Sequence, residues 1–120
     1  RLTLYKRISL AETREEIEAI REELADTCGS VDSRVENLLE VIGIRNTLKA
    51  IRVKRMEYDG RRMLLAFQKD SVVDPARIMS MVRADSRARL TPDLTLTLSA
   101  PAPGAGVIQE AKDLLERLVH

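Results

Sequence analysis

The spacing of apolar residues changes near residue 50, and this change constrains the fold more than any other feature of the sequence. Before it, apolar residues recur every three or four positions, as they do along one face of a helix. After it, short stretches alternate between apolar and polar residues, which is typical of half-buried strands. We therefore predict a single α+β domain over residues 1–120, with a helical part over about 1–50 and a mixed α/β part over about 51–120.

Three helices are predicted in the first part. Leu2–Ile8 has helical spacing, and a second helix begins at Thr13, which forms a capping box with Glu16 and precedes a C-terminal stop at Gly29. Asp32 is a suitable cap for a third helix. The apolar residues that this third helix turns inward are Val35, Leu38, Leu39 and Ile42.

The alternating stretches predict two hairpins that form a small antiparallel sheet. Ile51–Tyr58 reads as a strand that turns Val53 and, more weakly, Arg55 inward, and Met63–Phe67 reads as the returning strand. Asp59–Gly60 between them is typical of a type I′ turn, because both central residues of that turn have positive φ.

The second hairpin is predicted from Ala88–Leu90 and Leu94–Leu98, around a turn over 91–93. A helix that begins at Asp74–Pro75 separates the two hairpins, because Asp suits a helix cap and Pro suits the first helical position. A final amphipathic helix follows the Pro- and Gly-rich segment 100–104. Its apolar residues are Val107, Ile108, Ala111, Leu114, Leu115 and Leu118.

The residues that most enzyme sites need are scarce in this chain. Cys28 is the single cysteine and His120 the single histidine, which excludes an internal disulfide, a cysteine zinc site and a histidine-based triad. No phosphate-binding P-loop and no carboxylate cluster with magnesium-ligand spacing stands out. We expect no catalytic constellation, cofactor or metal, a partly buried Cys28, and a linker rather than an anion site at Gly104–Gly106.

The composition disfavours some classes of binding partner. Twenty Lys and Arg against 19 Asp and Glu give a net charge of +1, and the pI of about 8.1 is below that of a dedicated nucleic-acid binder. Two Tyr, one Phe and no Trp provide few stacking platforms for bases. No apolar run reaches the roughly 20 residues of a membrane span. The start at Arg1, without Met or a signal pattern, leads us to expect a piece of a longer cytoplasmic polypeptide with no membrane contact.

The small net charge hides two oppositely charged regions. Glu23 and Asp26 lie three residues apart at the end of an acidic helix, where carboxylates oppose the helix dipole and would suit a basic partner. The first hairpin is basic instead, and this surface leaves an alternative open: a nucleic-acid-binding module that contacts phosphates. Ordinary protection of an edge strand by cations explains the same charges. The basic residues concerned are Arg52, Lys54, Arg55, Arg61 and Arg62.

Five segments carry a resemblance to a known family. They are Arg1–Ile8, Glu23–Asp26, Gly29, Asn37–Leu39 and Ile44–Arg45. Together they resemble the C-terminal (TRCF) domain of bacterial transcription-repair coupling factor, Mfd, and the similarity continues more loosely to the final helix. Two departures stand out. The family usually has D-R-[FY]-G where this chain has Asp26-Thr27-Cys28-Gly29, and a glycine commonly precedes the first strand where this chain has Arg52.

The resemblance implies a regulatory domain without catalytic activity of its own. Such domains pack on the UvrB-like N-terminal module of the same polypeptide, hide its UvrA-binding surface, and restrain the ATP-driven DNA translocase until stalled RNA polymerase is engaged. Other domains of the parent protein bind the polymerase and DNA. By the same resemblance, Glu23 and Asp26 would face arginines of the UvrB-like module, with which carboxylates pair in bidentate geometry.

Overall fold

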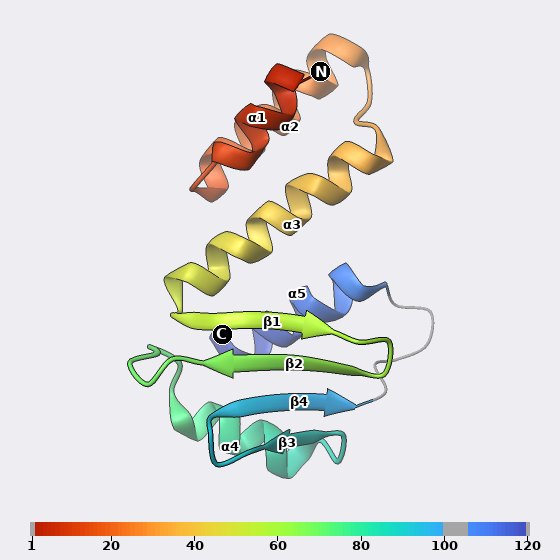
Figure 1. The fold of residues 1–120 in the computed structure, drawn as a ribbon. Coiled ribbons are helices and arrows are strands. Elements are labelled where there is room, and N and C mark those ends of the chain that lie inside the picture. Colours follow the sequence, from red (N-terminus) through yellow and green to blue (C-terminus); the bar gives the residue numbers. More distant parts are fainter. Residues whose placement is uncertain (1, 100–105, 120) are drawn as a thin grey trace. The chain divides into compact units, whose positions relative to one another are not determined.

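The computed structural model describes residues 2–99 and 106–119 (Figure 1). The chain divides into two compact units, residues 1–46 (unit 1) and 47–120 (unit 2), and their border falls inside the third helix. The elements over the described residues are α1 (Leu2–Leu10), α2 (Arg14–Cys28), α3 (Ser33–Ala50), β1 (Val53–Tyr58), β2 (Arg62–Phe67), α4 (Pro75–Ala84), β3 (Ala88–Leu90), β4 (Thr95–Ser99) and α5 (Val107–Val119). This element order confirms the predicted α+β class.

The helix ends of unit 1 follow the predicted capping chemistry. The Thr13 hydroxyl accepts the Glu16 amide at 3.1 Å, whereas the Glu16 carboxylate accepts the amide of Glu12 at 3.0 Å rather than that of Thr13. Gly29 ends α2 with φ 80°, a left-handed conformation that favours glycine. Asp32 accepts the Arg34 amide at 2.8 Å, which satisfies a free donor at the start of α3.

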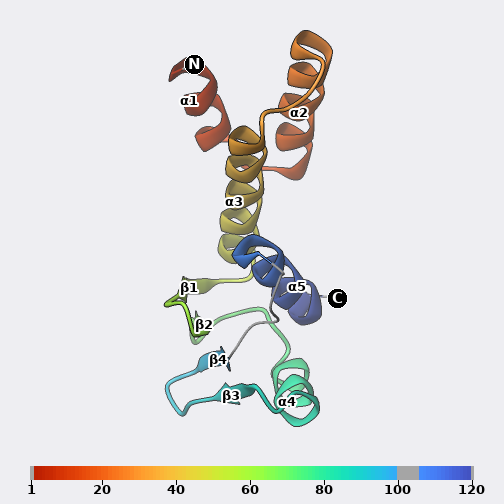
Figure 2. The ribbon, with the colours of Figure 1, turned by 90° about the vertical axis from the view of Figure 1, so that its right-hand side faces the viewer.

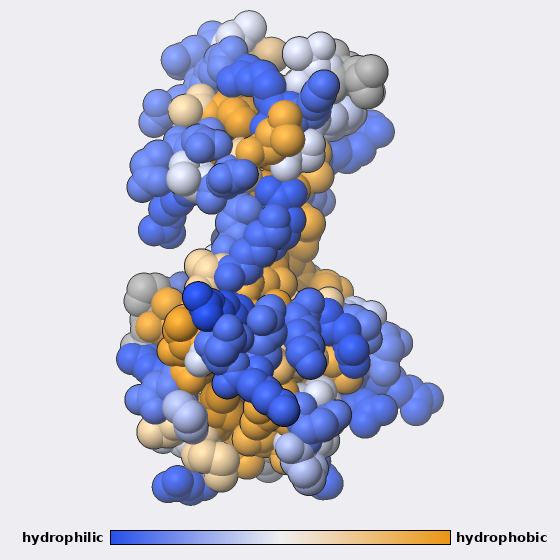
Figure 3. All heavy atoms as spheres, turned by 60° about the vertical axis from the view of Figure 1, so that its left-hand side comes forward, coloured by the Kyte–Doolittle hydropathy of each residue, from blue (hydrophilic) through white to orange (hydrophobic). Residues whose placement is uncertain are grey.

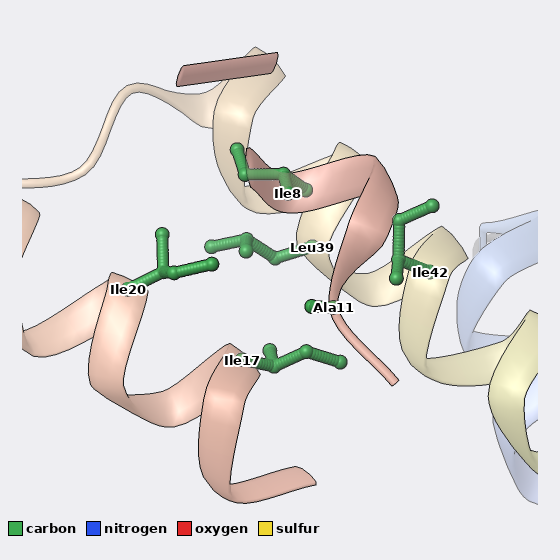
Figure 4. Close-up of a cluster of buried hydrophobic side chains, with 6 residues drawn as sticks. All are labelled: Ile8, Ala11, Ile17, Ile20, Leu39 and Ile42. Atoms are coloured by element: carbon green, nitrogen blue, oxygen red, sulfur yellow. The ribbon is translucent and has the colours of Figure 1, made fainter. Parts of the chain in front are cut away.

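Unit 1 has a small apolar core (Figure 4). Its buried residues come from α1, α2, α3 and the residue that follows α1: Ile8, Ala11, Ile17, Ile20, Leu39 and Ile42. Partly buried side chains of Leu4, Leu24, Val35 and Leu38 pack against this cluster. Burying the apolar stripes of three short helices against one another stabilises helices that would be marginal alone.

Unit 2 is a four-stranded antiparallel sheet in the order β1-β2-β4-β3, with α4 and α5 on one face (Figure 2). Alternate strand residues point toward these helices and are buried. They include Met63, Leu65, Phe67, Leu96 and Leu98. The helices contribute Ile78, Met81, Ala111, Leu114, Leu115 and Leu118 to the same side.

The first hairpin forms as predicted, but the predicted type I′ turn is wrong. Gly60 has φ 93°, while Asp59 is not among the described residues with positive φ, so only one central residue is left-handed. The Asp59 carboxylate accepts the amides of Arg61 at 2.9 Å and Arg62 at 2.8 Å, which closes a three-residue loop. These two hydrogen bonds also lower the pKa of Asp59. A side chain that bonds its own loop thus replaces the second left-handed residue.

A bulge at the start of β1 reverses the predicted faces. The register between β1 and β2 shifts between Val53 and Arg55, so Lys54 is the extra residue. Arg55 is consequently exposed and Met56 is half-buried, whereas strict alternation predicted Arg55 on the inner face. In the second hairpin, Leu94 has φ 61° and belongs to the turn, so β4 begins one residue later than predicted.

Some predictions fall on residues that the structure does not describe, namely those on Arg1, His120 and most of the segment from 100 to Gly106. Over the described residues, no helix is both long and apolar enough to cross a membrane. The visible surface of each unit is mainly hydrophilic, and smaller hydrophobic areas are interspersed with the hydrophilic ones (Figure 3).

Candidate interaction surface

Three carboxylates line the outer face of α2. Glu15, Glu22 and Asp26 recur at helical spacing opposite the buried Ile17 and Ile20, and all three are exposed. Among the described residues, none of the three forms an ion pair. We call these three residues the outer acidic face. It is a fixed array of negative charge on a rigid helix, which suits a basic protein surface.

Unlike Asp26, Glu23 forms an ion pair within unit 1. Arg7 of α1 donates to both Glu23 oxygens, from Nη2 at 2.8 Å and from Nη1 at 3.2 Å. This bidentate pair lowers the pKa of Glu23 and raises the pKa of Arg7. For Glu23, an arginine of this chain therefore already supplies a basic partner. Both side chains of the pair stay about half exposed, at 47% and 57%.

A second arginine ties α2 to α3. Arg21 donates to Glu36 at 2.7 Å and 3.1 Å, lies 3.6 Å from Glu40, and also pairs with Glu18 on its own helix. The hydrogen bond to Glu36 is the main cause of the raised pKa of Arg21. The acidic side chains near Arg21 thus form ion pairs within unit 1, whereas, among the described residues, those of the outer acidic face do not.

The end of α1 is held by α3. Arg45 donates to the main-chain oxygens of Ser9 at 2.9 Å and Ala11 at 3.0 Å, and the Asn46 amide donates to the same Ala11 oxygen at 3.0 Å. A helix end leaves carbonyl groups without partners, and a cation is favourable there. Sequence reasoning missed this cap, because Arg45 and Ser9 are 36 positions apart.

The structure separates the basic residues of the first hairpin into two groups. Arg52 and Lys54 lie where β1 begins, whereas Arg61 and Arg62 lie at the turn, one strand length or roughly 20 Å away. Arg55 pairs with Glu57 at 3.2 Å, and Arg52 pairs with Asp70 at 2.7 Å. The alternative basic surface thus has cations at both ends of the hairpin, with Arg55 between them.

Unit 2 has a polar cluster that the sequence analysis also missed. Asp85 follows α4, and its carboxylate accepts from the Arg87 amide at 3.0 Å, from the Arg87 guanidinium at 3.1 and 3.2 Å, and from Arg117 of α5 at 3.3 Å. These bonds, with those from Arg87 first, lower the pKa of Asp85 to about 2. The hydrogen bond to Asp85 is the main cause of the raised pKa of Arg87, and the charge of the buried Glu110 on α5 adds to it. The cluster connects the end of α4, the residue before β3 and α5. We call it the polar clamp of unit 2.

Residues of metal-ligating type are dispersed in the part of the chain that the structure describes. No group of three or more His, Cys, Asp or Glu could hold a metal ion there. Cys28 is exposed at the end of α2, so the expectation of partial burial is wrong. The reason is that the stripe which enters the core ends with Leu24, one turn earlier.

Comparisons with known proteins give the family. Residues 1–78 match the TRCF domain family. The transcription-repair-coupling factor of Myxococcus xanthus is 32% identical over 123 residues, which cover 100% of this chain and 10% of that protein. The transcription-repair-coupling factor of Escherichia coli (strain K12) is 28% identical over 83 residues, which cover 69% of this chain and 7% of that protein.

A solved structure shows the same fold. The crystal structure of a C-terminal domain of transcription-repair coupling factor superposes with a TM-score of 0.78 over 98% of this chain and 78% of that chain, at 18% identity. The chain spans about a tenth of the length of the curated relatives it matches. The match over residues 1–78 covers unit 1 and the first hairpin, and the chain belongs to the TRCF domain family.

Proposed function

We propose that this chain is the non-catalytic, autoinhibitory TRCF domain of a transcription-repair coupling factor. It packs on the UvrB-like N-terminal module of the same polypeptide and masks the surface that recruits UvrA. In this state it also restrains the ATP-driven DNA translocase until stalled RNA polymerase is engaged. The family membership supports the assignment. The observation that carries the contact is the outer acidic face of α2, whose Glu15, Glu22 and Asp26 have no ion-pair partner among the described residues.

The physical argument is intramolecular competition. A tethered domain has an effective concentration in the millimolar range, so contacts that would be weak between separate molecules can keep it closed. Exposed carboxylates give orientation and selectivity more than affinity, and salt screens them. The closed state is therefore only moderately stable. Polymerase or DNA bound elsewhere on the parent protein can open it with a few kcal/mol of differential binding.

Glu23 and Asp26 have different roles in this proposal. Asp26 is exposed, and we propose that it pairs with the module directly. Glu23 is already held by Arg7, so an arginine of the module must share or replace that bidentate pair. Because the Arg7–Glu23 pair is about half exposed, a second guanidinium can approach it without disturbing the core of unit 1.

A calorimetric titration of this chain with the separately produced UvrB-like module tests the contact. At low salt we expect binding that weakens as salt rises, and that is lost in the Asp26→Arg variant. For Glu23, the Glu23→Arg change is combined with Arg7→Glu, which restores the pair between α1 and α2 with swapped charges. Loss of binding in this double variant locates the partner at Glu23, and recovery of binding limits Glu23 to a structural role. Glu116→Arg on α5 makes the same charge change on unit 2 and serves as the control.

The full-length protein tests the consequence. Charge reversal at Asp26 is expected to raise both UvrA binding and basal ATPase activity, because the closed state is destabilised. If both stay unchanged while Glu116→Arg behaves in the same way, the outer acidic face is not the autoinhibitory contact.

A further inference from the structure

A cluster of four cations lies where α3 ends, β1 begins and β2 ends, all within unit 2. The Gln68 amide donates to the Arg52 carbonyl at 3.2 Å, and the Ser71 hydroxyl donates to the Ile51 carbonyl at 2.6 Å. These bonds hold the end of α3 and the start of β1 beside the loop that follows β2. We call the cations that this arrangement gathers the joint cluster: Lys49, Arg52, Lys54 and Lys69.

The joint cluster carries a clear excess of positive charge. All four side chains are exposed, and the only ion pair that any of them forms among the described residues joins Arg52 to Asp70 at 2.7 Å. Four cations and one carboxylate leave a local charge of +3. The three lysines are therefore available to an anionic partner.

The backbone at Arg52 is strained. Its φ of 58° lies in the left-handed region, which is sterically unfavourable for a residue with a Cβ atom. An exposed ion pair such as Arg52–Asp70 offsets little of this cost. Residues with a strained backbone tend to occur at functional sites, where the position of the side chain matters more than the conformational cost. Strain and excess charge thus coincide at one position.

We propose that the joint cluster binds the phosphate backbone of duplex DNA without reading its sequence. Lysines predominate, and a lysine ammonium binds phosphate as a point charge on a flexible side chain, without the directional geometry of arginine. No aromatic residue belongs to the cluster, which disfavours base stacking on single strands and also the aromatic anchors typical of protein interfaces. This site is separate from the outer acidic face in unit 1 and does not rest on the proposed autoinhibitory contact.

The expected binding is weak and strongly dependent on salt. Each phosphate contact contributes about −0.9 to the slope of log affinity against log salt concentration. Three to four contacts predict that affinity falls roughly 40- to 150-fold between 50 and 200 mM salt. Tethering to a protein that already holds DNA elsewhere would make such a weak contact effective.

Fluorescence anisotropy of this 120-residue chain with a labelled duplex of about 20 base pairs tests the proposal. The test variant is Lys54→Glu with Lys69→Glu. The matched control is Arg61→Glu with Arg62→Glu, which makes the same charge change at the other end of the same hairpin. At 50 mM salt we expect the test variant to bind at least about tenfold more weakly, with a salt slope lowered by about two, and the control to bind within about threefold of the unaltered chain.

Four outcomes would overturn the proposal, provided that circular dichroism shows all variants folded. They are no anisotropy change at 50 mM salt, equal weakening in the test and control variants, tighter binding to the matching single strand, and equally effective competition by polyglutamate of the same charge. Equal weakening would mean that binding follows net charge alone. The last two outcomes would replace the duplex with another polyanion.

Discussion

The two units use polar groups differently. In unit 1, three helices share a core of six buried residues, and arginines connect the helices to one another: Arg7 to Glu23, Arg21 to Glu36 and Arg45 to the end of α1. In unit 2, a four-stranded sheet and two helices bury a larger set of apolar side chains, and the Asp85 cluster is its main polar clamp. Unit 1 thus depends more on charged contacts, and unit 2 more on apolar packing.

Because of this difference, the two units are sensitive to different substitutions and conditions. Exposed ion pairs contribute little and are screened by salt, whereas a buried apolar side chain contributes several kcal/mol and is insensitive to salt. A short helical unit whose connections are charged can present a charged face to a partner without exposing its core. Four substitutions distinguish these two kinds of stabilisation.

Leu96→Ala is expected to have the largest effect. Leu96 lies in β4, between two neighbouring strands, and is 0% exposed. Removing its side chain should destabilise unit 2 by about 3–4 kcal/mol, because transfer free energy is lost and a cavity remains. Hydrogen exchange is the measurement that separates the units. Sheet amides should lose protection while α2 amides keep theirs, and equal loss in both would contradict independent packing of the units.

Arg45→Ala is the matching test in unit 1. It leaves the Ser9 carbonyl without its arginine donor and leaves Ala11 with Asn46 alone, so we expect a loss of about 1–3 kcal/mol. Urea unfolding followed by circular dichroism measures the change. Arg34→Ala is the control, since the Arg34 side chain is exposed and forms no hydrogen bond or ion pair among the described residues. An equal effect of the two substitutions would mean that the cap contributes nothing.

Much of the fold could be predicted from the sequence because its signals are local. The cap at Thr13, the stop at Gly29 and the Asp74–Pro75 helix start each depend on residues within one turn, and all three are observed. The position of the turn at Asp59 was predicted, but its conformation and the bulge at Lys54 were not. Both depend on how a backbone closes against a neighbouring strand, which hydrophobic alternation does not report.

The candidate surface was less predictable than the fold. Helical spacing placed Asp26 on the outer face of α2, and the structure agrees. The same spacing could not show that Glu23 reaches Arg7, because that contact joins residues 16 positions apart on different helices. The Asp85–Arg117 contact spans 32 positions for the same reason. Pairing between distant charged residues depends on helix packing angles, and composition does not encode them.

Acidification tests the polar clamp of unit 2. The folded pKa of Asp85 is about 2, below the ordinary value of 3.8, so its carboxylate stabilises the folded state above pH 4. This contribution is lost as the pH falls from 4 through 2, by about 1–2 kcal/mol. Asp85→Asn should remove this part of the pH dependence while leaving exchange in α2 unchanged. An unaltered acid profile in the variant would show that Asp85 is not the group that titrates.

Arg52→Gly is expected to have the smallest effect and the opposite sign. Arg52 follows α3 with φ 58°, and glycine adopts this conformation without steric cost. The gain from relieving strain exceeds the loss of the exposed pair with Asp70 and the extra freedom of glycine in the unfolded chain. Thermal unfolding should therefore show a stabilisation of about 0.5–1 kcal/mol. Asp70→Asn removes the ion pair without changing the backbone and should be nearly neutral. If Arg52→Gly is less stable than the unaltered chain and than Asp70→Asn, the side-chain contacts of Arg52 stabilise the fold more than its backbone strain destabilises it. If Arg52→Gly is more stable but binds duplex DNA less well, Arg52 contributes to binding at the expense of stability.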